Sequence, residues 1–251
     1  MKLIREKSIR EKTDEPTNKM LDLWHELCKE KLGKTLEVLL GNRREHRQLK
    51  EFRGELNTAH PGRIDGKDIL VIWLDQLKNV DFLIITHELG HLILRLQGFN
   101  TYTYLKERQS NIEILLNSMA LHPPLYNLQR SFGHEPQRMI DNRVNSNIKI
   151  FSESKESSDE RERIKNALLL TDDIFNCSNS IETKLKDILK VNHSNTFKLI
   201  TKILELIPYY DLLKPHKNIR FIKKVISAIN FDYGWWERRD GINAFKKLLK
   251  K

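Results

Sequence analysis

A strongly apolar segment with three ionisable residues in its middle constrains the fold of this chain more than any other feature. Residues 80–96 are predicted to form one helix, capped by Asn79 or Asp81 and closed by Gly98. Apolar residues lie on nearly all of its sides, so the helix is expected to be buried. It nevertheless contains the segment His87-Glu88-Leu89-Gly90-His91. Burying ionisable side chains without partners costs free energy, so these residues must find partners in the folded chain.

The spacing of the three ionisable residues is typical of a metal site. Histidines at positions i and i+4 lie one above the other on a helix, so His87 and His91 can both reach one Zn²⁺ ion. Glu88 stands beside the first ligand, where it can act as a general base toward a water molecule. The alternative interpretation is a pair of hydrogen-bonded core histidines without a metal. We predict one zinc ion per chain, with Glu88 as the catalytic residue.

A catalytic zinc usually has three protein ligands, so a third is expected outside this helix. Glu113 is the first candidate, because it lies among apolar residues of the next predicted helix, residues 105–121, without an obvious charge partner. Asn117 follows one turn later and could hold a ligand in place. The other candidates for the third ligand are His122, which comes next, then Glu107 and His134. The spacing specifies no donor for a developing oxyanion, and the candidates are His122, His134, Tyr102 and Tyr104.

These motifs resemble those of a known family. The segment Thr86-His87-Glu88-Leu89-Gly90-His91-Leu92, followed by Glu113-x-x-x-Asn117-x-x-Ala120 and a proline, is similar to the gluzincin metallopeptidases. Within them it is most similar to the ImmA/IrrE type. The positions that depart from that pattern are Leu116, Met119 and His122-Pro123-Pro124. The resemblance covers about residues 64–124, half the chain or less.

The resemblance implies a zincin-like core, in which two helices hold zinc beside a short sheet, with His87, His91 and Glu113 as ligands. It also implies a zinc-dependent endopeptidase that hydrolyses a peptide bond in an intracellular protein, such as a transcriptional repressor. A substrate peptide is expected to add to an edge of the sheet near residues 69–74.

The sequence as a whole predicts a mostly helical α+β chain. A helix is expected over residues 18–40, followed by a turn at His60-Pro61-Gly62. A hairpin at Asp65-Gly66 leads into a buried strand, residues 69–74. Helix 105–121 is expected to end before Pro123-Pro124. Beyond residue 150 only helices are predicted: 158–176, entered by a Ser157-x-x-Glu160 capping box, and 180–191, 195–207, 217–229 and 239–250.

We divide the chain into a charged N-terminal arm (1–17), a zincin-like metallopeptidase domain (18–150) and a basic α-helical domain (151–251). Of the net charge of +10, residues 181–251 carry +9, from 16 Lys+Arg against 7 Asp+Glu. This basic half could bind nucleic acid, or it could be a solvated helical surface. Four aromatic residues before Glu237-Arg238-Arg239 could stack on nucleobases or pack the end of the chain onto its domain: Phe231, Tyr233, Trp235 and Trp236.

Three general features complete the prediction. The longest apolar run, Ile69–Leu74, has six residues, far short of the roughly 20 that a membrane span needs, so no membrane partner is expected. No apolar segment follows the basic N-terminus, and only Cys28 and Cys177 occur, so a cytoplasmic location is expected. Together with the motif and the resemblance described above, these features give the leading hypothesis, a cytoplasmic zinc endopeptidase. The alternatives are a DNA-associated zinc protease that binds DNA through the basic half, and a zinc-containing sensor or interaction protein that cuts no peptide bond.

Overall fold

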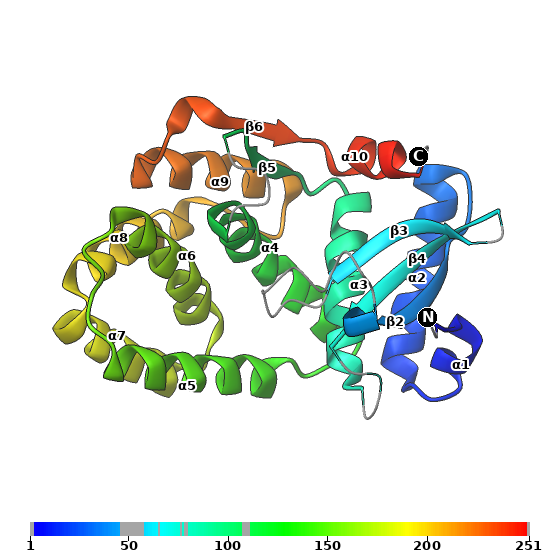
Figure 1. Ribbon diagram of the computed structural model, residues 1–251, viewed down its shortest axis with the longest axis horizontal. Helices are drawn as coiled ribbons and strands as arrows, with labels where there is room; N and C mark the ends of the chain where they lie inside the picture. The colour runs from blue at the N-terminus through cyan, green and yellow to red at the C-terminus, as the bar shows by residue number, and fades with distance from the viewer. Residues whose placement is uncertain are drawn as a thin grey trace. The chain divides into compact units, whose positions relative to one another are not determined.

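The computed structural model describes residues 3–45, 58–64, 66–75, 77, 80–106 and 111–249 (Figure 1). It is mostly helical with a small mixed sheet, which confirms the predicted α+β class. The chain divides into two compact units, named unit 1 (Met1–Gly98, Leu128–His134 and Asp240–Lys251) and unit 2 (Phe99–Asn127 and Glu135–Arg239). The units alternate along the sequence, whereas the sequence suggests one boundary near residue 150. Among the described helices, none is both long and apolar enough to cross a membrane.

Unit 1 is built around a four-stranded sheet in the order β1-β2-β4-β3. Its strands are β1 (Leu3–Ile4), β2 (Glu37–Asn42), β3 (Thr58–Ile64) and β4 (Lys67–Leu74). β2 and β4 run parallel, and the two outer pairs are antiparallel. β3 and β4 form the predicted hairpin, in which Gly66 has a φ of 75° and Asp65 lies outside the described residues. β4 contains the predicted strand 69–74 and lies inside the sheet, next to the edge strand β3.

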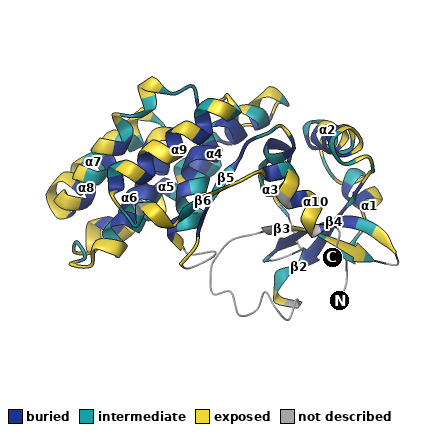
Figure 2. Ribbon diagram, turned by 90° about the horizontal axis from the view of Figure 1, so that it is seen from above, coloured by how far each residue is buried: buried dark blue, intermediate teal, exposed yellow. Residues whose placement is uncertain are grey.

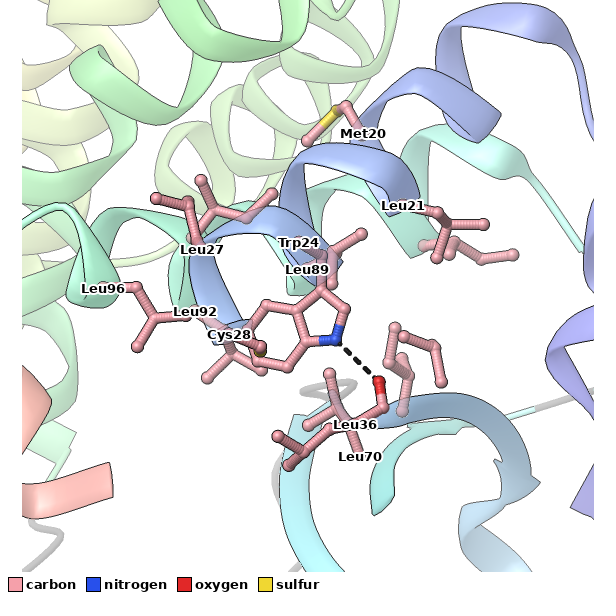
Figure 3. Packing of buried hydrophobic residues seen from close by; sticks show 14 of the residues in the cluster. Met20, Leu21, Trp24, Leu27, Cys28, Leu36, Leu70, Leu89, Leu92 and Leu96 are labelled. Atoms are coloured by element: carbon pink, nitrogen blue, oxygen red, sulfur yellow. Dashed lines mark hydrogen bonds between the residues drawn. The ribbon is translucent and has the colours of Figure 1, made fainter. Parts of the chain in front are cut away.

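The helices of unit 1 are α1 (Glu6–Arg10), α2 (Glu15–Leu32), α3 (Phe82–Leu96) and α10 (Gly241–Leu248), with a short 3-10 helix, η1 (Arg43–Glu45). α2 and α3 lie on one face of the sheet, where helices and strands share one apolar core (Figure 2). Trp24 of α2 is fully buried there, and its indole Nε1 donates a hydrogen bond to the carbonyl oxygen of Leu36 at 3.1 Å (Figure 3). A buried indole N–H needs such a partner. This core fixes α3, which carries the ionisable segment, above the sheet.

Three parts of unit 1 differ from the prediction. The helix predicted over residues 18–40 stops at Gly33, which adopts a left-handed φ of 73°, and the chain then enters β2. His60-Pro61-Gly62, predicted as a turn, lies in β3, where proline is tolerated because β3 is an edge strand. The predicted charged arm, residues 1–17, contains β1 and α1, and the side chain of Glu6 is buried.

Unit 2 is helical apart from a two-stranded sheet, in which β5 (Thr101–Tyr104) pairs antiparallel with β6 (Trp236–Arg239). Its helices are most of α4 (Asn111–Ser131), α5 (Gln137–Glu153), α6 (Glu160–Asn176), α7 (Asn179–Asn192), α8 (Ser194–Leu204) and α9 (Pro215–Ile229), with the 3-10 helices η2 (Ile207–Tyr209) and η3 (Tyr233–Trp235). Buried residues of α4, α6 and α9 form its main core. The predicted helices 158–176, 180–191, 195–207 and 217–229 are confirmed as α6 to α9, and 239–250 corresponds to α10.

Three predictions for unit 2 are wrong. α4 continues through Pro123-Pro124. Pro124 has no N–H to donate to the carbonyl of Ala120, and the side chain of Asn218 donates to that carbonyl instead. β6 is a strand beyond residue 150, and its partner β5 is far away in the sequence. The cap of α6 is Asp159 rather than the predicted Ser157-x-x-Glu160 box.

Candidate functional site

Helix α3 presents the ionisable segment as a compact group. The helix starts at a cap in which the Asp81 carboxylate accepts a hydrogen bond from the N–H of Leu83 at 2.9 Å. One turn apart on this helix, the rings of His87 and His91 have centroids 4.9 Å from each other and are nearly perpendicular. Both histidines and Glu88 are half-buried, while Leu89 between them packs into the core. The pair can therefore hold a metal ion as two of its ligands.

Glu88 has an altered acidity. Burial raises the pKa of its carboxyl group to about 8, because desolvation disfavours the charged form. A cation beside it would favour the carboxylate again and lower this pKa. A carboxyl group with a pKa near neutrality suits a general base or acid.

A polar contact fixes the first turns of α3. Thr86 is completely buried, and its hydroxyl donates to a backbone carbonyl one turn earlier. Gln129, from the end of α4 that belongs to unit 1, donates through Nε2 to Oγ1 of Thr86 at 2.9 Å and to the carbonyl of Leu83 at 3.1 Å. The sequence alone did not indicate this role of Gln129. The only indication in the sequence is that Gln129 is a polar residue among apolar positions of a helix.

Glu113 and Asn117, the predicted third ligand and its predicted support, both bind the backbone of β5 in unit 2. The carboxylate of Glu113 accepts a hydrogen bond from the N–H of Tyr104 at 3.0 Å. Asn117 bonds both the N–H and the carbonyl of Tyr102, at 2.9 and 2.8 Å, and the backbone carbonyl of Glu113 at 2.8 Å. These two side chains thus anchor β5 on α4. The role of Glu113 as a metal ligand stays a prediction.

The other candidates are in separate places. The hydroxyl of Tyr104 donates to the carboxylate of Asp232, and burial together with this bond raises the pKa of Tyr104 to about 12. His134 of unit 1 is buried, and burial lowers its pKa although the carboxylates of Asp14 and Asp81 act in the opposite direction. Tyr102 is half-buried in β5. Glu107 lies outside the described residues.

His122 is held by a carboxylate from a helix far away in the sequence. It is a buried residue of α4, and its Nδ1 lies 2.7 Å from Oδ2 of Asp172 in α6. Histidines that bind metals commonly have a carboxylate on the other ring nitrogen. The signal in the sequence was the pair Asp172-Asp173, which only Thr171 separates from the apolar run Ala167-Leu168-Leu169-Leu170. The tertiary structure was needed to bring this pair to His122.

The aromatic residues near the C-terminus pack against β5. The ring of Tyr104 contacts those of Phe231 and Trp236, with centroids 5.4 and 5.1 Å apart. The indole of Trp236 also donates to the carbonyl of Phe231 at 3.0 Å. Trp235 is about half exposed, and the ammonium of Lys106 lies over its ring. Phe231 and Trp236 therefore pack against β5.

Comparison with known proteins finds no significant match. No protein-family model matches the chain, and neither a curated protein nor a solved structure shows significant similarity to it. The site is therefore interpreted from its own residues. On α3 these fit a metal, because two imidazoles share one side of the helix beside a carboxyl group.

Proposed function

We propose that this protein is a zinc-dependent endopeptidase of the ImmA/IrrE type, acting on an intracellular protein. The observation that carries the proposal is the group on α3, where the His87 and His91 rings lie 4.9 Å apart next to a half-buried Glu88. A purely structural metal site has no need of that glutamate, whereas hydrolysis needs a base. The presence of Glu88 therefore supports an enzyme over a sensor that binds zinc without cleaving.

The third ligand comes from His122 or Glu113. We favour His122 because of the contacts that hold its ring within unit 2. Its ring nitrogen Nδ1 is hydrogen-bonded to the carboxylate of Asp172, as is typical of metal-binding histidines. The carboxylate of Glu113 already accepts the N–H of Tyr104, although its second oxygen could still bind a metal.

The chemistry divides between the ion and the side chains. A zinc ion supplies a Lewis acid that polarises the scissile carbonyl and makes water acidic enough to react near neutral pH. Glu88 accepts the proton of the attacking water and passes it to the leaving amine. The half-buried position of Glu88 limits the competition of bulk water for this proton.

Metal content tests the zinc site. We expect about one zinc per chain by mass spectrometry, lost in His87→Ala and in His91→Ala. His122→Ala and Glu113→Ala identify the third ligand, because only the variant that removes it should release the metal. A wild-type chain that stays metal-free after zinc is supplied would contradict the proposal and leave a pair of core histidines.

Proteolysis tests the reaction. Zinc-loaded protein should cleave candidate regulatory proteins or quenched peptide libraries, and a chelator should stop the cleavage. A chain that binds zinc through His87 and His91 but cleaves none of these substrates would support the sensor interpretation instead.

A second candidate function, a DNA-associated protease, is favoured by one observation. Helix α9 has no acidic residue between Pro215 and Ile229, and Arg220, Lys223 and Lys224 on it are exposed. Such a group of cations attracts a polyanion. On this hypothesis the full chain binds duplex DNA less tightly as salt rises, and replacing the three cations by glutamate removes binding while zinc content is unchanged. Absence of binding at low salt would reject it.

A further inference from the structure

His122 is fixed in a single orientation by its surroundings in unit 2. Its ring packs against that of Tyr126, one turn later on α4, with centroids 5.3 Å apart. The side chain is 9% exposed, and its Nδ1 is 2.7 Å from Oδ2 of Asp172. A ring held by both stacking and a hydrogen bond loses little further rotational freedom when it binds a ligand.

Both carboxylate oxygens of Asp172 accept hydrogen bonds from further residues. Its Oδ2 accepts a second hydrogen bond from Nη2 of Arg143 at 3.0 Å, and its Oδ1 accepts one from Nδ2 of Asn176 at 2.8 Å. Because both oxygens face N–H donors, the proton between Asp172 and His122 belongs to Nδ1 of the ring. The lone pair of the neutral imidazole is then on Nε2.

Arg143 has further partners besides Asp172. Its Nε donates to Oδ1 of Asp173 at 3.0 Å, and its Nη1 donates to the hydroxyl of Tyr126 at 3.2 Å. Asn147 donates to the other oxygen of Asp173 at 2.6 Å. Two adjacent carboxylates thus share one guanidinium, but Asp172 contacts the imidazole, whereas the described hydrogen bonds of Asp173 are to Arg143 and Asn147. This difference makes Asp173 a matched control.

We propose that Asp172 is the positioning residue of a metal ligand: it fixes His122 as the Nδ1–H tautomer and thereby makes Nε2 the atom that binds the metal. The inference rests on the proposed function, since it assigns a role to a residue behind the favoured third ligand. Carboxylates in this position raise the basicity of the imidazole and commonly change metal affinity by about 10–100-fold when removed.

The test compares two variants that each remove one negative charge from the same cluster. Zinc affinity is measured by competition with a chelator for the wild type, Asp172→Asn and Asp173→Asn. We expect about a 10–100-fold weaker affinity in Asp172→Asn and an unchanged affinity in Asp173→Asn. Circular dichroism and thermal unfolding of both variants show that each compared chain is folded. The wild type also gives a measurement that needs no variant: nitrogen NMR of histidine-labelled, metal-free protein, with His122 assigned by its loss in His122→Ala, should show the Nδ1–H tautomer.

Each other outcome has a definite meaning. Equal zinc affinity in the wild type and Asp172→Asn overturns the inference and leaves the zinc peptidase in place. Equal weakening in both variants also overturns it, because the effect then belongs to the cluster as a whole. Full zinc retention in His122→Ala, or an Nε2–H tautomer in the wild type, overturns it as well. A wild type that binds no zinc removes the proposed function, and this inference with it.

Discussion

The side chain of Asn218 replaces a backbone donor of helix α4. Its Nδ2 donates to the carbonyl oxygen of Ala120 at 2.6 Å, and also to that of Leu212 at 3.1 Å. In a regular helix the N–H of residue 124 would bind the carbonyl of Ala120, but that residue is Pro124. Since Asn218 and Ala120 are both buried, this carbonyl would otherwise lack a partner.

Asn218→Leu should therefore lower the free energy of unfolding by about 2 kcal/mol, because buried carbonyls lose their donor. Chemical denaturation followed by circular dichroism measures this change. Pro124→Ala supplies the missing N–H, so Asn218→Leu should have a smaller effect in that background. An equal effect in both backgrounds would show that Asn218 does not compensate for the proline.

Glu88→Gln should keep the zinc and lose the reaction. The variant preserves the size of the side chain and the ligands His87 and His91 but cannot accept the proton of water, so cleavage should fall by about 100-fold or more. Metal analysis and a peptide-cleavage assay on the same preparation measure both quantities. Glu26→Gln, at an exposed position of the neighbouring helix α2, is the matched control and should keep activity. Retained turnover in Glu88→Gln would remove the general base.

Glu6 should control the acid stability of unit 1. Burial alone would raise the pKa of its carboxyl group, but hydrogen bonds from His25, from the N–H of Val38 at 2.8 Å and from Arg10 hold the pKa below its ordinary value. The stabilisation is therefore complete above the unfolded pKa, about 4.3, and is lost as the pH falls through the lower folded value. The wild type should lose stability in that window.

Glu6→Gln should lower the free energy of unfolding by about 3 kcal/mol near pH 7, because it breaks a largely buried charged cluster. It should also flatten the dependence of stability on pH below about pH 4.3. Urea unfolding at several pH values measures both effects. Glu11→Gln removes an equal charge from an exposed position and should change stability by less than about 0.5 kcal/mol. A parallel pH dependence in wild type and Glu6→Gln would contradict this account.

Gly41 should tolerate no side chain. It pairs with Trp73 across the parallel strands β2 and β4, and a Cβ at this position would overlap the buried indole ring. Gly41→Ala should therefore destabilise the protein by about 2 kcal/mol, since the ring must move within a packed sheet. Gly62→Ala in the edge strand β3 is the control, because the nearest atom, of Ile69, is 4.0 Å from the added carbon. Similar melting temperatures for Gly41→Ala and the wild type would disprove the close contact.

Much of the secondary structure followed from local patterns. Asp81 caps α3 as its position in the sequence indicated, and the helical spacing of apolar residues predicted α6 to α9. The same rules failed where distant residues decided the outcome. The apolar residues of β2 also fit a continuation of the preceding helix, and only pairing with β1 and β4 selects the strand. The proline pair predicts an early end of α4, because the donor that allows the helix to pass Pro124 comes from the distant residue Asn218.

The pair of imidazoles with Glu88 beside them follows from the local sequence, since positions i and i+4 on a helix share a face wherever the helix lies. The contacts that hold the other candidate residues follow from the packing of elements far apart in the chain. This packing binds Glu113 and Asn117 to the backbone of β5, and it brings Asp172 to His122 from 50 residues away. Helix geometry acts within a few residues of the chain, whereas these contacts depend on how whole helices and strands pack, and no local pattern encodes that packing.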